Sequence, residues 1–363
     1  MGPGALGVGR TPVEGPTVLV TDGASGQGRS AVAAVRALAA GGYRPVVTTS
    51  GPHSLAAASR WCAGATTTPV AGSPDYPAAV RDAAERSGAL TVLAASDAAL
   101  MALDAPVAHL VDKAVLADRA TEAGLATPPS VAYDGADRFQ ADLAAGTTTL
   151  PVVAKPVVSS QSARLIESAA DAGELQTMSG PFLVQPYIRE RIWAIAGVVH
   201  GGRAVAAVQQ RYVRIWPVAC GTASAAVTIP VDEDRLSALE RLLDGYEGIF
   251  QAQFAGETLL DLNPRVYGSL PLAVAAGVNL ATIWCGLVEG RLTPFPARGR
   301  AGVRYRWLEG DIRHVASGLR ARQLGIGAAV AALGPHAGTA HSVEALSDPG
   351  PLVARLMHAV GRR

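Results

Sequence analysis

Two oxygen-bearing side chains, Asp261 and Asn263, alternate with Leu260 and Leu262 in a segment that has the pattern of a β-strand. Successive side chains of a strand point to opposite faces, so we expect the two leucines on one face and the polar pair on the other. Arg265 joins the polar face if the strand continues. A carboxylate, an amide and a guanidinium on one face suit a hard cation and the phosphates that it bridges. The alternative is an ordinary hairpin with one solvated face.

The residues before this strand also alternate, and residues 255–258 can turn the chain back as a β-hairpin. A three-residue loop there would set Gln253 opposite Asp261 and Gln251 opposite Asn263. The two amides would then extend the polar face onto the neighbouring strand.

Lysine is rare in this chain. Of the 31 basic residues, only Lys113 and Lys155 are lysines, and the other 29 are arginines. Lysine is a compact point charge and arginine is a wide planar fork, so a narrow phosphate-binding site can distinguish them. We expect the two lysines to lie where arginine cannot replace them, although chance survival would also explain them.

Short apolar strands alternate with helical stretches in the first hundred residues, which predicts a parallel sheet in an α/β domain. The expected strands are Thr17 to Thr21, Pro45 to Thr49, Thr66 to Val70 and Leu90 to Ala95, with a first helix from Ser30 to Ala40.

The first strand runs into a turn that contains Gly23, Gly26 and Gly28. This turn resembles the glycine-rich turn of short-chain dehydrogenases, whose backbone amides meet a dinucleotide pyrophosphate. That family also has a Tyr-x-x-x-Lys pair, but His109 and Pro151 stand four residues before the two lysines. A nicotinamide-dependent oxidoreductase is therefore the weakest of the open alternatives.

A second domain is expected to begin near residue 111, where Asp112 is a candidate N-cap of a helix. Further on, Lys155 ends a short apolar strand, and a loop of small hydroxyl residues follows, including Ser159 and Ser160. Such a lysine and loop can hold a phosphate chain between an ammonium group and backbone amides. Residues 270–287 predict one buried helix.

Composition limits the function classes. The chain has 363 residues, is 49% hydrophobic and 17% charged, and carries a formal net charge of +1. We therefore expect no nucleic-acid partner, and no apolar run is long enough to cross a membrane. The three widely spaced cysteines suit a cytoplasmic protein, and the Gly/Pro-rich start resembles a loose tail rather than a signal peptide.

Taken in order, these features resemble the ATP-grasp superfamily, most closely its carboxylate–amine ligase branch. The likeness covers about residues 17 to 320. It is carried by Asp112-Lys113 at a helix start, Val153-Ala-Lys155-Pro, Leu183-Val-Gln-Pro-Tyr-Ile188 and Leu260-Asp-Leu-Asn-Pro-Arg265.

The resemblance implies an α/β fold in which an N-terminal Rossmann-like (pre-ATP-grasp) domain precedes an ATP-grasp fold. The latter consists of a small α+β lid and a larger central α+β domain. The expected division is a flexible tail at 1–16, the Rossmann-like domain at 17–110, a linker helix and the lid at 111–188, the central domain at 189–326 and a C-terminal segment at 327–363.

The resemblance also implies a nucleotide site. Lys113 and Lys155 would meet the α- and β-phosphates of ATP, Gln185 would read the adenine amino group, and the Ile188 backbone amide would meet a ring nitrogen. The remaining residues expected at the nucleotide are Ser159, Ser160, Tyr187 and Glu190, of which Glu190 would replace a missing ribose-binding acid.

For the metal and the chemistry, the resemblance implies that Asp261 and Asn263 bind Mg²⁺ and that Arg265 follows them as a catalytic residue. Gln253 stands where the family has its first metal carboxylate. Arg211 and Arg214 occupy the strand region from which the family brings an arginine to the γ-phosphate.

The implied activity is an ATP-dependent ligase that joins a carboxylate to an amine through an acyl phosphate and releases ADP and phosphate. Small-molecule acids and amines, amino-acid-like or peptide-like, are the expected substrates, and a homodimer is left open. The neutral Gln253 keeps a second alternative open, a degenerate ATP-grasp protein that binds nucleotide without ligase activity.

Overall fold

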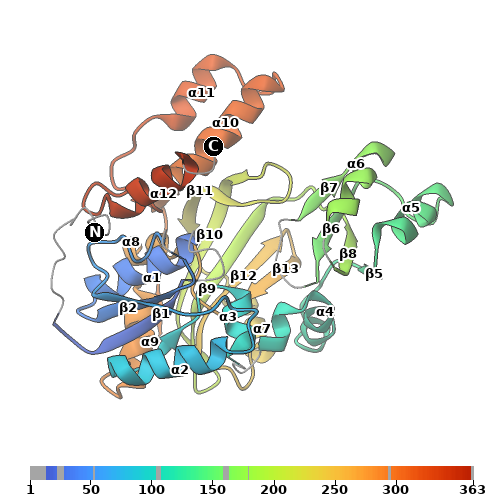
Figure 1. Ribbon diagram of the computed structural model, residues 1–363. Coiled ribbons are helices and arrows are strands. Elements are labelled where there is room, and N and C mark those ends of the chain that lie inside the picture. The colour runs from blue at the N-terminus through green and yellow to red at the C-terminus, as the bar shows by residue number, and fades with distance from the viewer. Residues whose placement is uncertain are drawn as a thin grey trace.

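The computed structural model is a mixed α/β structure with three β-sheets in its described part (Figure 1). This confirms the predicted fold class. The residues that the structure describes are 14–22, 28–51, 54–103, 108–157, 163–178, 180–292 and 296–360. Within those ranges no helix is both long and apolar enough to cross a membrane.

Four parallel strands form the first sheet, in the order β3-β2-β1-β4. The elements of this part are β1 (Thr17–Thr21), α1 (Arg29–Ala40), β2 (Arg44–Thr49), β3 (Gly64–Thr67), α2 (Tyr76–Ser87), β4 (Val92–Leu93), α3 (Asp97–Ala102) and the 3₁₀ helix η1 (Ala108–Val111). Side chains alternate along β1, so that Val18 and Val20 pack on α1 while Leu19 packs on the side of α2.

Helix α1 is buried on nearly all sides. It lies between the first sheet and the helices α8 and α9 of the central domain (Figure 1). Its alanines let these elements approach closely, and Val32 and Leu38 fill the space between them without exposed surface. The first residues of α1 are thereby held at one place relative to both domains.

The second sheet is antiparallel, has the order β5-β8-β6-β7 and forms the lid. Its core consists only of lid residues, and Tyr133, Phe139 and Phe182 are the aromatic side chains at its centre. The lid elements are β5 (Val131–Tyr133), α5 (Ala136–Ala144), β6 (Val152–Pro156), β7 (Arg164–Ile166), α6 (Ala169–Gly173), η2 (Glu174–Thr177) and β8 (Phe182–Pro186).

The third sheet has the order β13-β12-β9-β10-β11-β15-β16, and β14 pairs with β10 at one place. Its strands are β9 (Ile192–His200), β10 (Arg203–Trp216), β11 (Thr222–Ile229), β12 (Gly248–Ala255), β13 (Thr258–Asn263), β14 (Ala297–Arg298), β15 (Arg304–Arg306) and β16 (Ala340–His341). Because β16 pairs with β15, part of the predicted C-terminal segment completes this sheet.

Helices cover both faces of the third sheet. On one face lie α8 (Leu270–Ala275) and α9 (Leu280–Val288), and on the other lie α4 (Lys113–Glu122) and α7 (Glu233–Leu242). The remaining helices are α10 (Leu308–Arg320), α11 (Ile326–Leu333) and α12 (Gly350–Val360).

The single buried helix predicted for residues 270–287 is wrong, because the chain breaks between α8 and α9. Gly277 adopts a φ of +93°, in the left-handed region that glycine enters readily. Asn279 then begins α9, where its side chain accepts a hydrogen bond from the Thr282 amide.

One buried carboxylate joins α10 to the third sheet. Asp311 has no exposed surface, and both of its oxygens pair with Arg214 of β10, at 2.6 and 3.0 Å. Arg306 of β15 adds a second ion pair at 3.2 Å. Arg214 also donates to the carbonyl of Ala332, so the same cluster reaches α11.

We expect Asp311→Ala to lower the free energy of unfolding strongly, because Arg214 and Arg306 would lose their shared carboxylate. Removing one partner of a buried ion pair costs about 3–5 kcal/mol. The midpoint of urea unfolding measures the change. Asp82→Ala is the control, since Asp82 pairs with Arg86 on the surface and such pairs contribute at most about 1 kcal/mol. Similar small losses in both variants would contradict a structural role for Asp311.

Candidate functional site

A cavity of about 770 Å³ is lined by residues from the first domain, the lid and the central domain. Its size lies in the ordinary range for small-molecule sites. The described lining residues include five basic side chains, Arg29, Lys113, Lys155, Arg265 and Arg355, and one carboxylate, Asp261. The cavity therefore suits a ligand that carries several negative charges.

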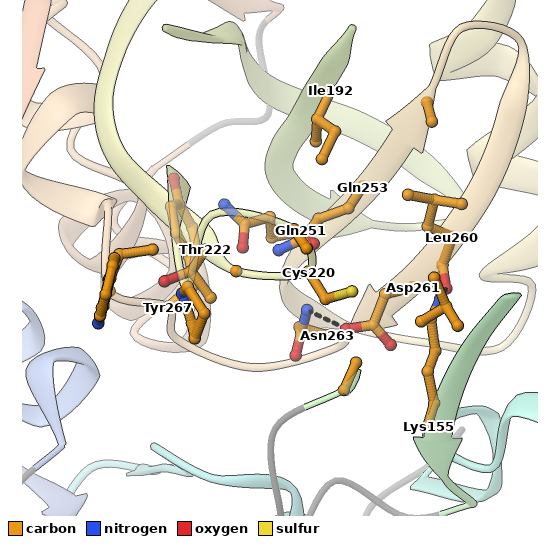
Figure 2. Close-up of a pocket in the computed structure, with 18 of the residues that line it drawn as sticks. Lys155, Ile192, Cys220, Thr222, Gln251, Gln253, Leu260, Asp261, Asn263 and Tyr267 are labelled. Carbon is orange, nitrogen blue, oxygen red and sulfur yellow. Dashed lines mark hydrogen bonds between the residues drawn. The ribbon is translucent and has the colours of Figure 1, made fainter. Parts of the chain in front are cut away.

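The hairpin of β12 and β13 forms the floor of this cavity. Gln253 pairs with Asp261 and Gln251 with Asn263, which confirms the predicted register. The Asn263 amide donates to Asp261 Oδ2 at 3.3 Å. Figure 2 shows these side chains gathered on the same side of the hairpin.

The turn of the hairpin differs from the prediction. Ala255 pairs directly with Thr258, so two residues form the turn, and a β-bulge follows at Leu260. The extra residue restores the expected pairing further along, because a bulge sets two residues against one. The prediction that Leu260 and Leu262 share one face is therefore wrong. Leu262 lies in the core, while the bulge places Leu260 in the cavity lining.

Lys113 lies beside Asp261, with Nζ 3.7 Å from Oδ1. It is the first residue of α4, and its place is fixed by Asp112, whose carboxylate accepts hydrogen bonds from the Ala114 and Val115 amides. Only 7% of the Lys113 side chain is exposed. The helix cap predicted from the sequence thus places one of the two lysines at the cavity.

Lys155 reaches the same region from β6 of the lid. Its ammonium group donates to the carbonyl of Leu260 at 3.4 Å (Figure 2). Leu260 is the residue that the bulge displaces into the cavity. Burial lowers the pKa of Lys155, the charge of Lys113 lowers it further, and the charge of Asp261 opposes both effects. An anion bound here would favour the charged form and raise the pKa of Lys155 again.

Arg265 is held from three directions. Its guanidinium pairs with Asp97 of α3 and donates to Asn263 Oδ1 at 2.6 Å and to the Val266 carbonyl at 3.1 Å. The bond to Asn263 orients that amide beside Asp261. Arg265 therefore connects the end of the hairpin to the first domain, and it also lines the cavity.

The residues expected at the adenine lie at the lid edge. Gln185 is 5% exposed, and its amide nitrogen donates to Ser130 Oγ at 2.7 Å, which leaves its carbonyl oxygen as an acceptor. Tyr187 and Ile188 line the cavity as well. Glu190 instead packs against the turn at Gly256 and is absent from the described lining.

Two expected arginines do not reach the described cavity lining. Arg214 is engaged by Asp311, and Arg211 lies half-buried on β10. Ser159 and Ser160, like Gly23 and Gly26 of the glycine-rich turn, lie outside the described residues. Their predicted roles stay predictions.

Arg29 and Arg355 line the cavity although the sequence did not single them out. Arg355 comes from α12, near the end of the chain, and pairs with Glu309. Arg29 follows Gly28 as the first residue of α1. Its position after a glycine-rich strand-to-helix turn was the signal that could have identified it.

Cys220 lies half-buried in the loop between β10 and β11 and lines the cavity near Lys155 (Figure 2). Burial raises the pKa of its thiol to about 11, an effect that Lys155 opposes. The thiol is therefore neutral at ordinary pH and does not compete with Asp261 as an anionic ligand.

The described residues contain no cluster of three or more carboxylate, histidine or cysteine side chains that could hold a metal by themselves. Asp261 is 26% exposed at its side chain and is flanked by the amides of Gln253 and Asn263. Mg²⁺ commonly uses one or two carboxylates together with substrate phosphates and water. The donor set therefore fits a Mg²⁺ ion that arrives with a phosphate ligand.

Several solved structures share this fold. N5-carboxyaminoimidazole synthetase from Staphylococcus aureus has a TM-score of 0.59 at 13% identity, over 82% of each chain. L-amino acid ligase from Bacillus licheniformis has a TM-score of 0.54 at 12% identity, over 77% of this chain and 76% of that one.

A third similar structure was solved with MgADP and bicarbonate. It is the biotin carboxylase domain of the Hydrogenobacter thermophilus 2-oxoglutarate carboxylase, with a TM-score of 0.58 at 15% identity over 79% of this chain and 73% of that one. No protein-family model matches the sequence, and no curated protein does. The structural likeness shows that the chain has the ATP-grasp fold, as predicted.

We expect Gln253→Glu to bind Mg²⁺ more tightly and to be less stable without it. The new carboxylate would face Asp261 directly across the hairpin, where like charges cost up to about 1 kcal/mol. A bound Mg²⁺ ion would offset this repulsion, so the stability loss should disappear when Mg²⁺ is added. Calorimetric Mg²⁺ titration and thermal melts measure both effects.

The exposed Gln323→Glu serves as the control for a simple change in net charge. If Gln253→Glu and the unmodified protein bind Mg²⁺ with the same affinity, Gln253 lies outside the metal site.

Proposed function

We propose that this protein, which has the ATP-grasp fold, is an ATP-dependent ligase that joins a carboxylate to an amine. The observation that carries the proposal is the convergence of Lys113 from α4, Lys155 from the lid and Asp261 from the central domain on one cavity. The similar structures of an L-amino acid ligase and of a biotin carboxylase domain bound to MgADP support the same proposal.

ATP would lie between the lid and the hairpin. Its adenine would meet the Gln185 carbonyl oxygen and the Ile188 backbone at the lid edge, and its phosphates would reach Lys155 and Lys113. A Mg²⁺ ion held by Asp261 and Asn263, with help from the Gln253 amide, would neutralise charge on the phosphates.

The reaction would proceed in two displacements. A carboxylate oxygen of the first substrate attacks the γ-phosphorus of ATP, the bond to the bridging oxygen breaks, and ADP leaves from an acyl phosphate. The amine nitrogen then attacks the acyl carbon, phosphate leaves, and the nitrogen loses a proton to give the amide. Positioning and charge neutralisation supply most of the rate of such phosphoryl transfers.

Each residue has a distinct part in this scheme. Lys155 and Lys113 offset negative charge as it shifts toward ADP, and Arg265 keeps Asn263 oriented beside Asp261. The lid would exclude water, which would otherwise hydrolyse the acyl phosphate.

The competing function is nucleotide binding without ligation. It is favoured by the neutral Gln253 and by the ion pair that holds Arg214 away from the described cavity lining. Release of ADP that depends on an added acid and amine separates the two functions, because a binding protein would take up nucleotide without this turnover.

Lys155→Arg and Asp261→Asn should both lose nearly all acid- and amine-dependent ADP release. Arginine would replace the compact ammonium group beside the Leu260 carbonyl with a wide planar fork, and asparagine removes the one carboxylate in the described lining. The assay would follow ADP and phosphate with ATP, Mg²⁺ and a panel of amino-acid pairs, with product mass as confirmation. Exposed Asp134→Asn in the lid is the matched control.

Melting temperatures within a few degrees of the unmodified protein should accompany the lost activity, which excludes unfolding as its cause. If Asp261→Asn retained full activity, its metal role would be disproved, and full activity in Lys155→Arg would remove the argument from the rarity of lysine.

At a pH where Lys155 of the free protein is partly deprotonated, ATP binding should take up protons through this side chain. The pKa of this side chain is lowered in the free protein, and a bound phosphate favours the protonated form, so binding raises that pKa. Affinity should therefore fall as the pH rises through the free-protein pKa. Calorimetry in buffers of different ionisation enthalpy measures the uptake. Lys155→Arg, which stays protonated, should lose it, and equal uptake in both proteins would refute the assignment.

A further inference from the structure

Arg29 has an unusual set of partners among the cavity arginines. Its guanidinium donates to Tyr305 Oη at 3.0 Å and to Thr222 Oγ1 at 2.8 Å, and it lies over the Trp307 ring at 3.9 Å from the centroid. All of these partners are neutral. Arg265 and Arg355, by contrast, each pair with a carboxylate.

None of the ion pairs formed within the described residues includes Arg29. Its positive charge is therefore fixed in position and is not neutralised by a protein carboxylate there. Keeping a half-buried cation without a counter-charge is unfavourable, and a bound anion would compensate it. Two of its five N–H groups are used by Tyr305 and Thr222, which leaves others for such a ligand.

The guanidinium is also held in a narrow space. Trp307 covers it at stacking distance, and a Cβ placed on Gly268 would lie only 3.3 Å from Arg29 Cζ. A planar group restricted in this way is pre-organised, because less side-chain entropy is lost when it forms hydrogen bonds.

The Arg29 region is a different part of the cavity from the phosphate region. Figure 2 shows Thr222 and Tyr267 on one side and Lys155 with Leu260 on the other, with Asp261 and Asn263 between them. A ligand at Thr222 is thus separated from the group that Lys155 would bind.

The chemistry of this region selects a singly charged planar anion. One guanidinium fork matches the two oxygens of a carboxylate, whereas a phosphate dianion would call for more positive charge than the neutral Thr222 and Tyr305 hydroxyls provide. Trp307, Tyr267 and Trp216 add aromatic surface to the described lining. The ligand therefore combines a carboxylate with an apolar portion.

We propose that Arg29 binds a substrate carboxylate that is not consumed in the reaction, and so makes this ligase select an amino-acid-like substrate with a free carboxylate. The proposal rests on the ligase function proposed above. Arg29 acts by binding and orientation, and it takes part in no bond-breaking step.

The test measures binding and needs no turnover. L-phenylalanine, L-leucine and L-glutamate are titrated calorimetrically into the full chain with Mg²⁺ and a non-hydrolysable ATP analogue, each beside its α-carboxamide and beside inorganic phosphate. We expect at least one amino acid to bind and its amide to bind about tenfold or more weakly, since a charge-assisted hydrogen-bond pair is lost. Arg29→Gln should abolish this preference, and Arg29→Lys should keep only part of it.

Arg86→Gln, on the surface of α2, is the control arginine. Affinity for the ATP analogue should be the same in all variants. A structural role alone for Arg29 would lower the melting temperature and leave the acid-over-amide preference intact, which would overturn the proposal. Failure of all three amino acids to bind, or tighter binding of phosphate at Arg29, would also overturn it.

Gly268→Ala provides a second variant that keeps the arginine itself. The new methyl group would press on the guanidinium, so the preference for the acid should weaken while Arg29 remains present. Unchanged preference in both Gly268→Ala and Arg29→Gln would disprove the assignment.

The two proposals fail separately. An acid-over-amide preference that depends on Arg29, without ADP release from any substrate pair, supports the carboxylate site and rejects the ligase. ADP release with an unchanged KM for both substrates in Arg29→Gln supports the ligase and rejects the carboxylate site.

Discussion

Basic side chains from three parts of the chain converge on one cavity, and they must be held there although like charges repel. The structure meets this constraint with carboxylates placed mainly behind the cavity wall. Asp97 of α3 pairs with Arg265, and Glu309 of α10 pairs with Arg355, and neither carboxylate is part of the described lining. Among the described lining residues, Asp261 is the only carboxylate. The neutralising charges thus support the arginines without repelling an anionic ligand, and they tie α3 and α10 to the hairpin and to α12.

The bulge at Leu260 serves the same arrangement. It turns a leucine out of the core and presents its carbonyl to Lys155, so that a lid residue meets the hairpin through a neutral dipole. Stacking of Trp193 on Phe254 at 4.3 Å, and a hydrogen bond from the Trp193 indole to the Gly256 carbonyl, hold the hairpin turn that precedes the bulge. Local strand geometry therefore decides which groups the lid can contact.

Much of the site followed from local patterns. The alternation of polar and apolar residues predicted the pairing of Gln253 with Asp261, and the Asp112 cap predicted where α4 begins. These features depend on neighbours in sequence or on a single tight turn. The overall fold was predicted from the order of the motifs along the chain and from the positions of the two lysines.

Features that depend on distant contacts were not predictable. The ion pair of Arg214 involves Asp311, 97 residues further along the chain. The role of Arg29 rests on Tyr305, 276 residues further along the chain. The break at Gly277 is different, because Gly277 and the Asn279 cap are local signals that the apolar character of the run outweighed in the prediction. For both arginines the deciding contact lies in another element, which periodicity does not report.

The separate aromatic core of the lid has a consequence for how ligands are held. Tyr133, Phe139 and Phe182 are buried among lid residues alone, so the lid can tilt as one piece without exposing that core to water. The chain enters the lid next to the hairpin, where the Leu259 amide donates to the Ala126 carbonyl at 2.8 Å, so this edge of the lid is attached to the hairpin. A ligand that touches both Lys155 and Asp261 would favour the closed orientation over open ones. Its measured affinity would then combine two equilibria, contact with the site and closure of the lid, and be weaker than the contacts alone would give.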